Sequence, residues 1–308
     1  MAAANPILVT GSHRSGSTWT GKMIALSPKT IYLQEPFNEH YYNPGISRAY
    51  FDVPFCYITN DNEAAYRNSL RRTANLQYNW MDALKQAKRW RKFAHVGLEG
   101  GQFLRHRLAH HHPLFKDPFA LLSTEWLVEK FKMAPIILIR HPAAFTSSVK
   151  RFAWESPVHL LLQQELLMRD LLEPLRGEIE EFLTEEHTIV EQAAQFWKIL
   201  HYVINIYQQR HPEWYFVRHE DLSRDPIGGF QKIYAYLDLP FTTDIQTSIA
   251  AFTNEKNPSS SNEQTTAVKL NSRANIWSWK ERLTPHEIER IREISGDVGA
   301  MFYADDEW

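Results

Sequence analysis

A short apolar run that leads through a glycine-containing turn into a helix constrains this chain more than any other feature. Residues 7–10 are apolar and β-branched, which is typical of a buried parallel strand. The turn Gly11-Ser12-His13-Arg14-Ser15-Gly16 follows, and a helical pattern begins around Thr18. Two glycines five residues apart let the backbone wrap an anion, and a helix N-terminus adds free N–H donors. The sequence therefore predicts a phosphate-binding turn on an α/β sheet.

The glycine spacing of this turn matches a Walker A loop, but the lysine of that motif is missing. Ser17 stands at the lysine position, Arg14 supplies a cation inside the turn, and Lys22 follows one helical turn later. A nucleotide kinase or ATPase on the same strand–loop–helix unit is therefore disfavoured, and no acidic metal ligand follows an apolar strand convincingly. Taken alone, the motif also fits a glycine turn that binds nothing.

Apolar runs and helical patterns alternate along the rest of the chain. We expect strands at 30–33, 113–115, 136–139 and 214–218, and helices at 18–26, 63–74, 79–93, 120–132, 157–183, 188–209, 226–237 and from Thr284 onward. This alternation predicts one α/β domain over 1–308, a three-layer sandwich around a central parallel sheet. We expect 40–113 and 157–209 to be insertions that line a substrate site, and 254–275 to be a surface loop.

Charge and cysteine content narrow the class of protein. The net charge is −2, so no global field draws the chain to nucleic acid or to an anionic membrane. Cys56 is the only cysteine, which excludes an intrachain disulfide and suits a reducing compartment. No apolar run has the length of a signal peptide or a bilayer span. We therefore expect a cytoplasmic protein without a nucleic-acid partner.

A second basic site is expected where the most apolar strand ends. Arg140 follows Ile136–Ile139, and Ser148 lies eight residues later in the next helix. The carboxyl ends of parallel strands are where open α/β sheets bind ligands, and a guanidinium presents a fork of donors to a phosphate. Ser147 competes for the hydroxyl role, and a salt bridge at the strand end is the other interpretation of Arg140.

The segment Arg14-Ser15-Gly16-Ser17-Thr18-Trp19 resembles the 5′-phosphosulfate loop of the PAPS-dependent sulfotransferases, in their carbohydrate and bacterial-type branch. Arg140 and Ser148 resemble the 3′-phosphate motif of that family. The resemblance implies a P-loop-like fold and transfer of a sulfuryl group from 3′-phosphoadenylyl sulfate (PAPS) to a carbohydrate, glycolipid or small-alcohol hydroxyl, without a metal. It implies that residues 14–18 bind the 5′-phosphate and that Trp19 stacks on adenine. An inactive nucleotide-binding protein of the same fold is the alternative.

Three weaker matches extend the resemblance toward the C-terminus. His219 stands where the family usually has a tyrosine against adenine, in Val217-Arg218-His219-Glu220-Asp221-Leu222. Phe252, ahead of Lys256-Asn257-Pro258, resembles the second adenine-contacting aromatic, with a spacing that differs by one residue. Arg273 and Lys280 resemble the basic residues of the loop that closes over the 3′-phosphate. The Arg-Lys-Gly triplet of the small-molecule branch is missing there.

The resemblance also assigns the groups that would carry the chemistry. Lys116 resembles the lysine beside the transferring group, with Arg14 as a second cation. Pro118 stands where the small-molecule branch has its basic histidine, so another general base is needed.

Three residues are candidates for that base. Glu35, in Gln34-Glu35-Pro36-Phe37, resembles the Phe-Glu-Pro-Leu segment of carbohydrate sulfotransferases, although it could instead only pair with Arg14 or Lys22. Asp117 comes second, because a residue before Pro118 also suits a turn or cap. His40 is third.

A histidine cluster at 106 and 110–112 invites a metal-site interpretation. No cysteine or acidic ligand accompanies it, so we expect a solvated loop there and no metal.

Overall fold

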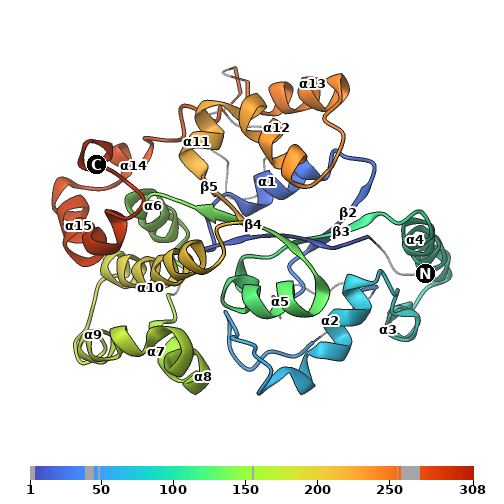
Figure 1. The fold of residues 1–308 in the computed structure, drawn as a ribbon, viewed down its shortest axis with the longest axis horizontal. Helices are drawn as coiled ribbons and strands as arrows, with labels where there is room; N and C mark the ends of the chain where they lie inside the picture. Colours follow the sequence, from blue (N-terminus) through green and yellow to red (C-terminus); the bar gives the residue numbers. More distant parts are fainter. Residues whose placement is uncertain (1–3, 39–44, 48, 155, 255, 258–270) are drawn as a thin grey trace.

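The computed structural model describes residues 4–38, 45–47, 49–154, 156–254, 256–257 and 271–308 (Figure 1). Within these residues, five parallel strands form a sheet in the order β2-β3-β1-β4-β5: β1 (Ile7–Gly11), β2 (Thr30–Gln34), β3 (His112–Lys116), β4 (Ala134–Ile139) and β5 (Tyr215–Arg218). The chain crosses from one side of β1 to the other between β3 and β4. Ligands of open α/β sheets bind at such a switch point, and the turn after β1 lies there.

Both faces of the sheet are buried, as the apolar strands predict. Ile7, Val9 and Leu138 pack on one face with residues of α1 (Ser17–Ile24), α12 (Pro226–Tyr236) and α13 (Thr243–Phe252). On the other face, strand residues such as Leu8 and Ile137 pack toward α5 (Thr124–Phe131), α6 (Pro142–Phe152) and α10 (Ile189–Arg210). Figure 1 shows the sheet between these two helix layers. The α/β three-layer prediction is confirmed.

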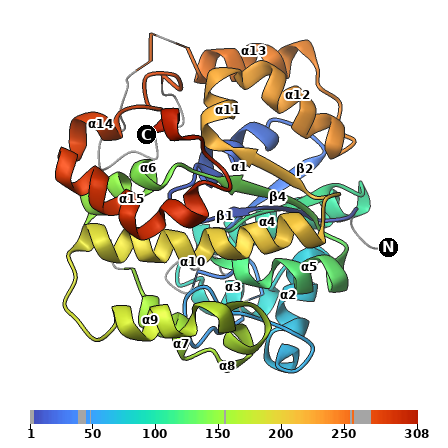
Figure 2. The ribbon, with the colours of Figure 1, turned by 60° about the vertical axis from the view of Figure 1, so that its left-hand side comes forward.

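Helices from the C-terminal half pack against α6, which carries Ser148 of the second basic motif. Helix α10 begins at a capping box in which the Thr188 hydroxyl accepts from the Glu191 N–H, and it packs along α6 and α15 (Pro285–Gly299) (Figure 2). A second capping box, Thr284 with Glu287, starts α15 where the sequence predicts it. Helix α14 (Trp279–Arg282) also contacts α6, whereas the short α11 (His219–Arg224) follows β5 and packs on α12. A 3₁₀ turn lies at Asp305–Glu307.

The single long helix predicted for 157–183 is wrong. The segment is instead α7 (Val158–Leu162), α8 (Glu165–Leu167), a π turn (Met168–Leu172), a 3₁₀ turn (Glu173–Leu175) and α9 (Arg176–Phe182). The Gln164 side chain bonds to the backbone of a distant loop: it accepts from Tyr57 N at 2.8 Å and donates to Phe55 O at 3.2 Å. Pro174 has no N–H to continue the helix. The break therefore comes from tertiary hydrogen bonds and one proline.

Residues 63–108 also differ from the prediction. A 3₁₀ turn (Glu63–Ala65) precedes α2 (Arg67–Ala74), and the predicted helix 79–93 divides into α3 (Trp80–Gln86) and α4 (Trp90–Leu108). A 3₁₀ turn at Pro118–Ser123 likewise precedes α5. None of the helices in the described ranges is long and apolar enough to cross a bilayer. Most of the loop expected at 254–275 lies outside the described residues.

Candidate active site

The turn after β1 has a backbone that only glycine accommodates at two positions. Gly11 has φ 143° and Gly16 has φ 95°, both in the left-handed half of φ space. A Cβ on Gly11 would lie 2.4 Å from Leu138 O, and a Cβ on Gly16 would lie 2.4 Å from Cδ2 of His219. Arg14 also has a positive φ, 64°, which is uncommon outside glycine. The turn therefore packs so closely against β4 and His219 that only glycine fits at these two positions.

Several hydroxyls around this turn are buried without a hydrogen-bond partner. Ser12 Oγ, Ser15 Oγ and Thr20 Oγ1 are in this state, among the residues that the structure describes. An unsatisfied buried hydroxyl costs roughly 1–3 kcal/mol, and such groups in a native fold call for an explanation. An anion seated in the turn would supply partners for those that face it.

Arg14 and the residues of the second basic motif lie in contact. Arg14 Nε donates to Ser148 Oγ at 2.8 Å, and a terminal nitrogen of Arg140 donates to the carbonyl of Arg14. Ser147 Oγ, the competing hydroxyl, is buried without a hydrogen-bond partner among the described residues. Within the described ranges, neither arginine forms an ion pair with a carboxylate. The two predicted basic motifs thus form one site.

Two further arginines, which the sequence analysis missed, add to this positive charge. Burial, together with the positive charges of Arg140 and Arg151, lowers the pKa of Arg14 to about 10. Burial and the charge of Arg151 also lower the pKa of Arg282. The Arg14 guanidinium lies 4.2 Å from the ring centroid of Phe152. Such a cluster of like charges favours a ligand that carries more than one negative charge.

Lys116 and Glu35 form an ion pair at the ends of β3 and β2. Lys116 is 1% exposed, and its Nζ contacts Glu35 Oε1. Asn38 Nδ2 donates to the other carboxylate oxygen of Glu35 at 2.6 Å. The pairing of Glu35 with Arg14 or Lys22, offered as an alternative by the sequence, is not the one observed. Lys22 Nζ instead lies 4.0 Å from the ring centroid of Tyr32.

Asp117 holds the neighbouring loops together. Its side chain is fully buried and accepts from Phe37 N at 2.5 Å and from Phe119 N at 3.0 Å. Burial raises the pKa of Asp117 to about 8, against the effect of the Phe37 hydrogen bond. The carboxylate caps the 3₁₀ turn that starts at Pro118 and fixes the segment after Glu35. His40, the third candidate base, lies outside the described residues.

Comparison with known proteins decides the family. The model of the sulfotransferase family matches residues 6–243. The chain belongs to the sulfotransferase family. Carbohydrate sulfotransferase 4 of Mus musculus is 22% identical over 336 positions, which cover 95% of this chain and 80% of the relative.

Two shorter or more distant similarities accompany this match. Carbohydrate sulfotransferase 5 of Mus musculus is 30% identical over 80 residues, which are 26% of this chain and 20% of that relative. The solved structure of the sulfotransferase domain from the curacin biosynthetic pathway aligns with 95% of this chain and 98% of its own, at 17% identity and a TM-score of 0.48.

In this sulfotransferase, the aromatic candidates lie on the α1 side of the sheet. Trp19 is half-buried, with its ring centroid 5.8 Å from that of His219 and 5.3 Å from that of Phe230. Burial lowers the pKa of His219 to about 3, so this ring is neutral. Phe252 ends α13 and packs against the same apolar cluster as Trp19. The structure thus places Trp19 beside His219 and gathers Trp19 and Phe252 at one cluster.

Glu220 is a site residue that the sequence analysis missed. It is 4% exposed and accepts from His141 N at 3.1 Å and from the Tyr303 hydroxyl at 2.9 Å. Burial raises the pKa of Glu220, while nearby Arg140 opposes that shift. The carboxylate therefore joins the end of β5 to the segment after β4 and to the C-terminal region, directly behind Arg140. In the sequence, the position of Glu220 just after a predicted strand and next to Asp221 could have marked it as a candidate.

The two basic residues predicted for the C-terminal loop have other partners. Arg273 Nε donates to Arg224 O at 3.2 Å, and Lys280 Nζ donates to Trp308 O at 3.0 Å. Lys280 also lies 4.7 Å from the ring centroid of Trp277. The described residues therefore do not bring Lys280 to Arg140. Arg282, two residues later on α14, is the C-terminal cation whose charge acts on Arg140.

The histidine cluster is only partly in a loop. His106 belongs to α4 and His112 opens β3, so the expectation of a solvated loop holds only for the turn between them. His106 Nδ1 and His111 Nδ1 lie 2.8 Å apart. No group of three or more histidine, cysteine or acidic side chains suited to a metal occurs in the described part of the chain.

Proposed function

We propose that this chain transfers a sulfuryl group from PAPS to an acceptor hydroxyl. One observation carries the proposal: the Arg14–Ser148 hydrogen bond joins the two basic motifs into a single site at the rim of the sheet. PAPS carries a phosphosulfate at one end of its adenosine and a 3′-phosphate at the other. The strands β1 and β4 that present Arg14 and Arg140 are adjacent, so one nucleotide can reach both.

The described residues suit that donor. The turn residues Ser15, Gly16, Ser17 and Thr18 offer hydroxyls and helix N-terminal N–H groups to a 5′-phosphate. Arg140 and Ser148 would bind the 3′-phosphate. Trp19, with His219 and Phe252, would contact the adenine. The roles of Arg273 and Lys280 remain predictions from the resemblance to the family.

The reaction needs a base for the acceptor hydroxyl and cations on the leaving group. In our proposal the acceptor oxygen attacks sulfur as Glu35 takes its proton, and the bond from sulfur to the bridging oxygen breaks. Lys116 and Arg14 stabilise the charge that develops on that oxygen, and adenosine 3′,5′-bisphosphate leaves. The Lys116–Glu35 contact supports this division of roles because it places the cation and the carboxylate side by side.

The acceptor is proposed to be a carbohydrate, glycolipid or small alcohol. A polar cavity of about 440 Å³ lies in the 40–113 segment, lined by residues such as Asn68, Arg72 and Asp82. Such a lining suits hydroxyl groups, which supports an acceptor role for this insertion; the 157–209 segment is its proposed second wall. The cytoplasmic location expected from the sequence stays a prediction.

The test is a transfer assay with ³⁵S-labelled PAPS and a panel of carbohydrate, glycolipid and alcohol acceptors, with EDTA present. We expect label on a hydroxyl of one class, at a rate that EDTA leaves unchanged. Tight binding of adenosine 3′,5′-bisphosphate without transfer to any acceptor would instead favour an inactive nucleotide-binding protein. Magnesium-dependent phosphoryl transfer from ATP would favour the kinase alternative.

A further inference from the structure

Exposed apolar side chains are concentrated on α3 and α4. Of the thirteen large hydrophobic residues exposed in the described ranges, eight belong to these two helices: Trp80, Met81, Leu84, Trp90, Phe93, Leu98, Leu104 and Leu108. The other five, Tyr50, Trp154, Leu183, Trp277 and Met301, are scattered over the chain. Single exposed hydrophobics are ordinary, but a contiguous group marks an interaction surface.

The exposed residues of α4 form a stripe along its whole length. Positions 90, 93, 97, 101, 104 and 108 recur every three or four residues, which places them on one face of a helix. Trp90 is 75% exposed and Leu108 is 59% exposed. A Cβ on Gly97 or Gly101 would meet nothing within 4 Å. We refer to this face as the α4 stripe, and nothing in the described part of the chain covers it.

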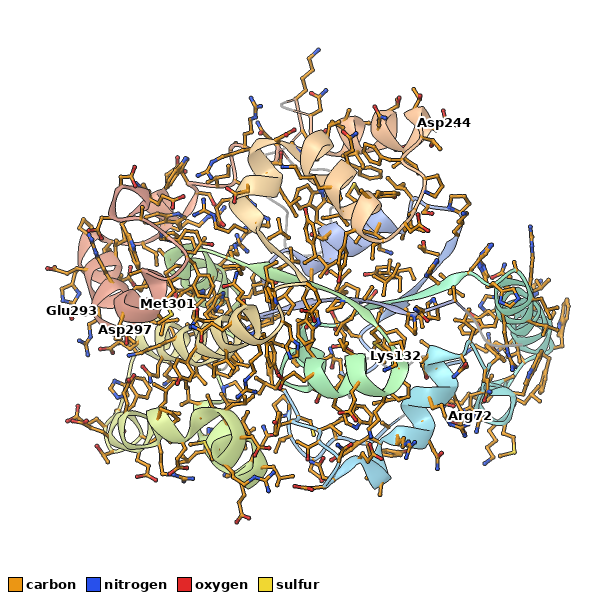
Figure 3. All side chains as sticks on the ribbon, viewed as in Figure 1. Arg72, Lys132, Asp244, Glu293, Asp297 and Met301 are labelled. Carbon is orange, nitrogen blue, oxygen red and sulfur yellow. The ribbon has the colours of Figure 1, made fainter. Side chains whose placement is uncertain are left out.

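A neighbouring side of α4, next to the stripe, attaches the helix to the protein. Val96 is buried in a small cluster with Tyr78 and Ala83, and Phe103 packs against that cluster. Gly100 lies under the ring of Trp80, where a Cβ would be 2.2 Å from the ring. Figure 3 shows the side chains of α4 projecting outward at the edge of the molecule, away from the sheet. Helix α4 therefore packs on the protein through other residues, and the α4 stripe stays exposed.

The same segment is strongly basic in a chain whose net charge is −2. Residues 80–108 contain seven lysines and arginines against two acidic residues, Asp82 and Glu99, a local net charge of +5. The basic residues are Lys85, Lys88, Arg89, Arg91, Lys92, Arg105 and Arg107. Lys85, Lys88, Arg89 and Lys92 are exposed, and no ion pair among the described residues involves them. Their charge is therefore available to an external anion.

We propose that α3 and α4 form a docking surface for an anionic lipid bilayer. Helix α4, 19 residues and about 28 Å long, would lie in the plane of the membrane. Its stripe would enter the boundary between headgroups and acyl chains, and its basic residues would contact lipid phosphates. Charge decides against a second copy as the occupant, because pairing two such surfaces would bring two +5 segments together. An apolar stripe edged by lysine and arginine is the pattern of interfacial helices.

Vesicle co-sedimentation tests this proposal without PAPS or an acceptor, so its outcome is independent of the proposed reaction. Vesicles of phosphatidylcholine alone are compared with vesicles in which roughly a third of the lipid is phosphatidylglycerol. We expect the full chain to bind the anionic vesicles at least about tenfold more tightly. Binding should fall at least about tenfold in Trp90→Ser/Leu104→Ser and in Lys88→Glu/Arg89→Glu/Lys92→Glu.

The matched control is Leu183→Ser/Met301→Ser, which removes exposed apolar groups elsewhere and should bind like the unchanged chain. Circular dichroism checks that each variant is folded. The proposal fails if anionic vesicles do not bind the unchanged chain, or if both α4 variants bind as it does. It also fails if light scattering shows self-association that Trp90→Ser/Leu104→Ser abolishes while no vesicle binding occurs, because a second copy would then be the occupant.

Discussion

A buried lysine and a carboxylate in contact are the residues on which the proposed chemistry depends. Lys116 is almost wholly enclosed, and Glu35 at the rim neutralises its charge and can also face an acceptor. If Glu35 is the general base, Glu35→Gln should lower turnover by about a hundredfold or more. Affinity for adenosine 3′,5′-bisphosphate should stay nearly intact, because that ligand lacks the sulfuryl group. Single-turnover kinetics and calorimetry measure the two quantities separately.

The control for this prediction is Glu173→Gln, which removes an exposed carboxylate paired with Arg176. It should change neither turnover nor affinity. A Glu35→Gln enzyme that turns over like the unchanged chain would remove Glu35 from the role of base. Asp117 would not simply replace it, because its carboxylate oxygens accept from the backbone N–H groups of Phe37 and Phe119.

From the sequence, candidate site residues can be proposed where they lie within one strand–loop–helix unit, and their roles stay predictions. Arg14 follows β1 directly, and Arg140 and Ser148 belong to one strand end and the helix after it, so their spacing carries the information. Arg282 and Tyr303 come from distant parts of the chain, and only the packing of α14 and α15 brings them behind Arg140. No local pattern encodes that proximity.

At the scale of elements, the turn after β1 and helix α4 respond oppositely to the same substitution. Gly16→Ala places a Cβ against His219 at a φ of 95°, so we expect a loss of about 2 kcal/mol in the free energy of unfolding. Gly97→Ala adds a methyl in open space within a helix and should raise it by up to about 1 kcal/mol. Urea unfolding measures both. Equal effects of the two changes would contradict the geometry described for the turn.

The strands and the helices differ in how well the sequence predicts them. All five strands lie where apolar runs predict them. The inner strands β3, β1 and β4 are almost wholly buried, which requires mainly apolar side chains, whereas the edge strands β2 and β5 are partly exposed. The amphipathic pattern of 157–183 predicts a helix, yet Gln164 bonds to residues 55 and 57 and Pro174 ends the continuation. Helix α4 extends fifteen residues past the predicted end at 93, in a region where three glycines and an exposed apolar face obscure the pattern.

Over the whole molecule, buried neutral histidines make stability depend on pH. Burial lowers the pKa of four of them to about 3: His13, His141, His201 and His219. Each takes up a proton on unfolding between pH about 6.5 and about 3, so stability rises with pH there. The raised pKa values of Asp117 and Glu220 act in the opposite direction. The four histidines outnumber these two carboxyl groups, so near pH 5.5 we expect a net uptake of protons on unfolding and a stability that rises with pH.

His201→Phe isolates one of these histidines away from the proposed site. The ring stacks on Trp197 with centroids 3.9 Å apart, which phenylalanine can preserve. The slope of unfolding free energy against pH should fall by about 1.4 kcal/mol per pH unit, the equivalent of one proton. His286→Phe, on the exposed surface of α15, is the control. A slope that His201→Phe leaves unchanged would show that His201 titrates in the folded chain as it does in the unfolded one.

The charge of the molecule is distributed unevenly. Both proposals depend on where the positive charges lie and not on the net charge. The net charge of −2 conceals both the arginines around the turn after β1 and the +5 segment of α3 and α4. The expectation that the chain has no attraction for anionic membranes follows from the sum alone. The vesicle experiment tests whether the local positive charge of α3 and α4 attracts such membranes.

Calorimetric titration with adenosine 3′,5′-bisphosphate measures whether Arg14 and Arg140 bind the two ends of one nucleotide, as we propose. Arg14→Ala and Arg140→Ala should each weaken binding by about 1.5–3 kcal/mol, and Arg176→Ala, on the exposed surface, should leave it unchanged. If both site variants bind this ligand as tightly as the unchanged chain, the two basic motifs do not form a nucleotide site and the proposed function is contradicted.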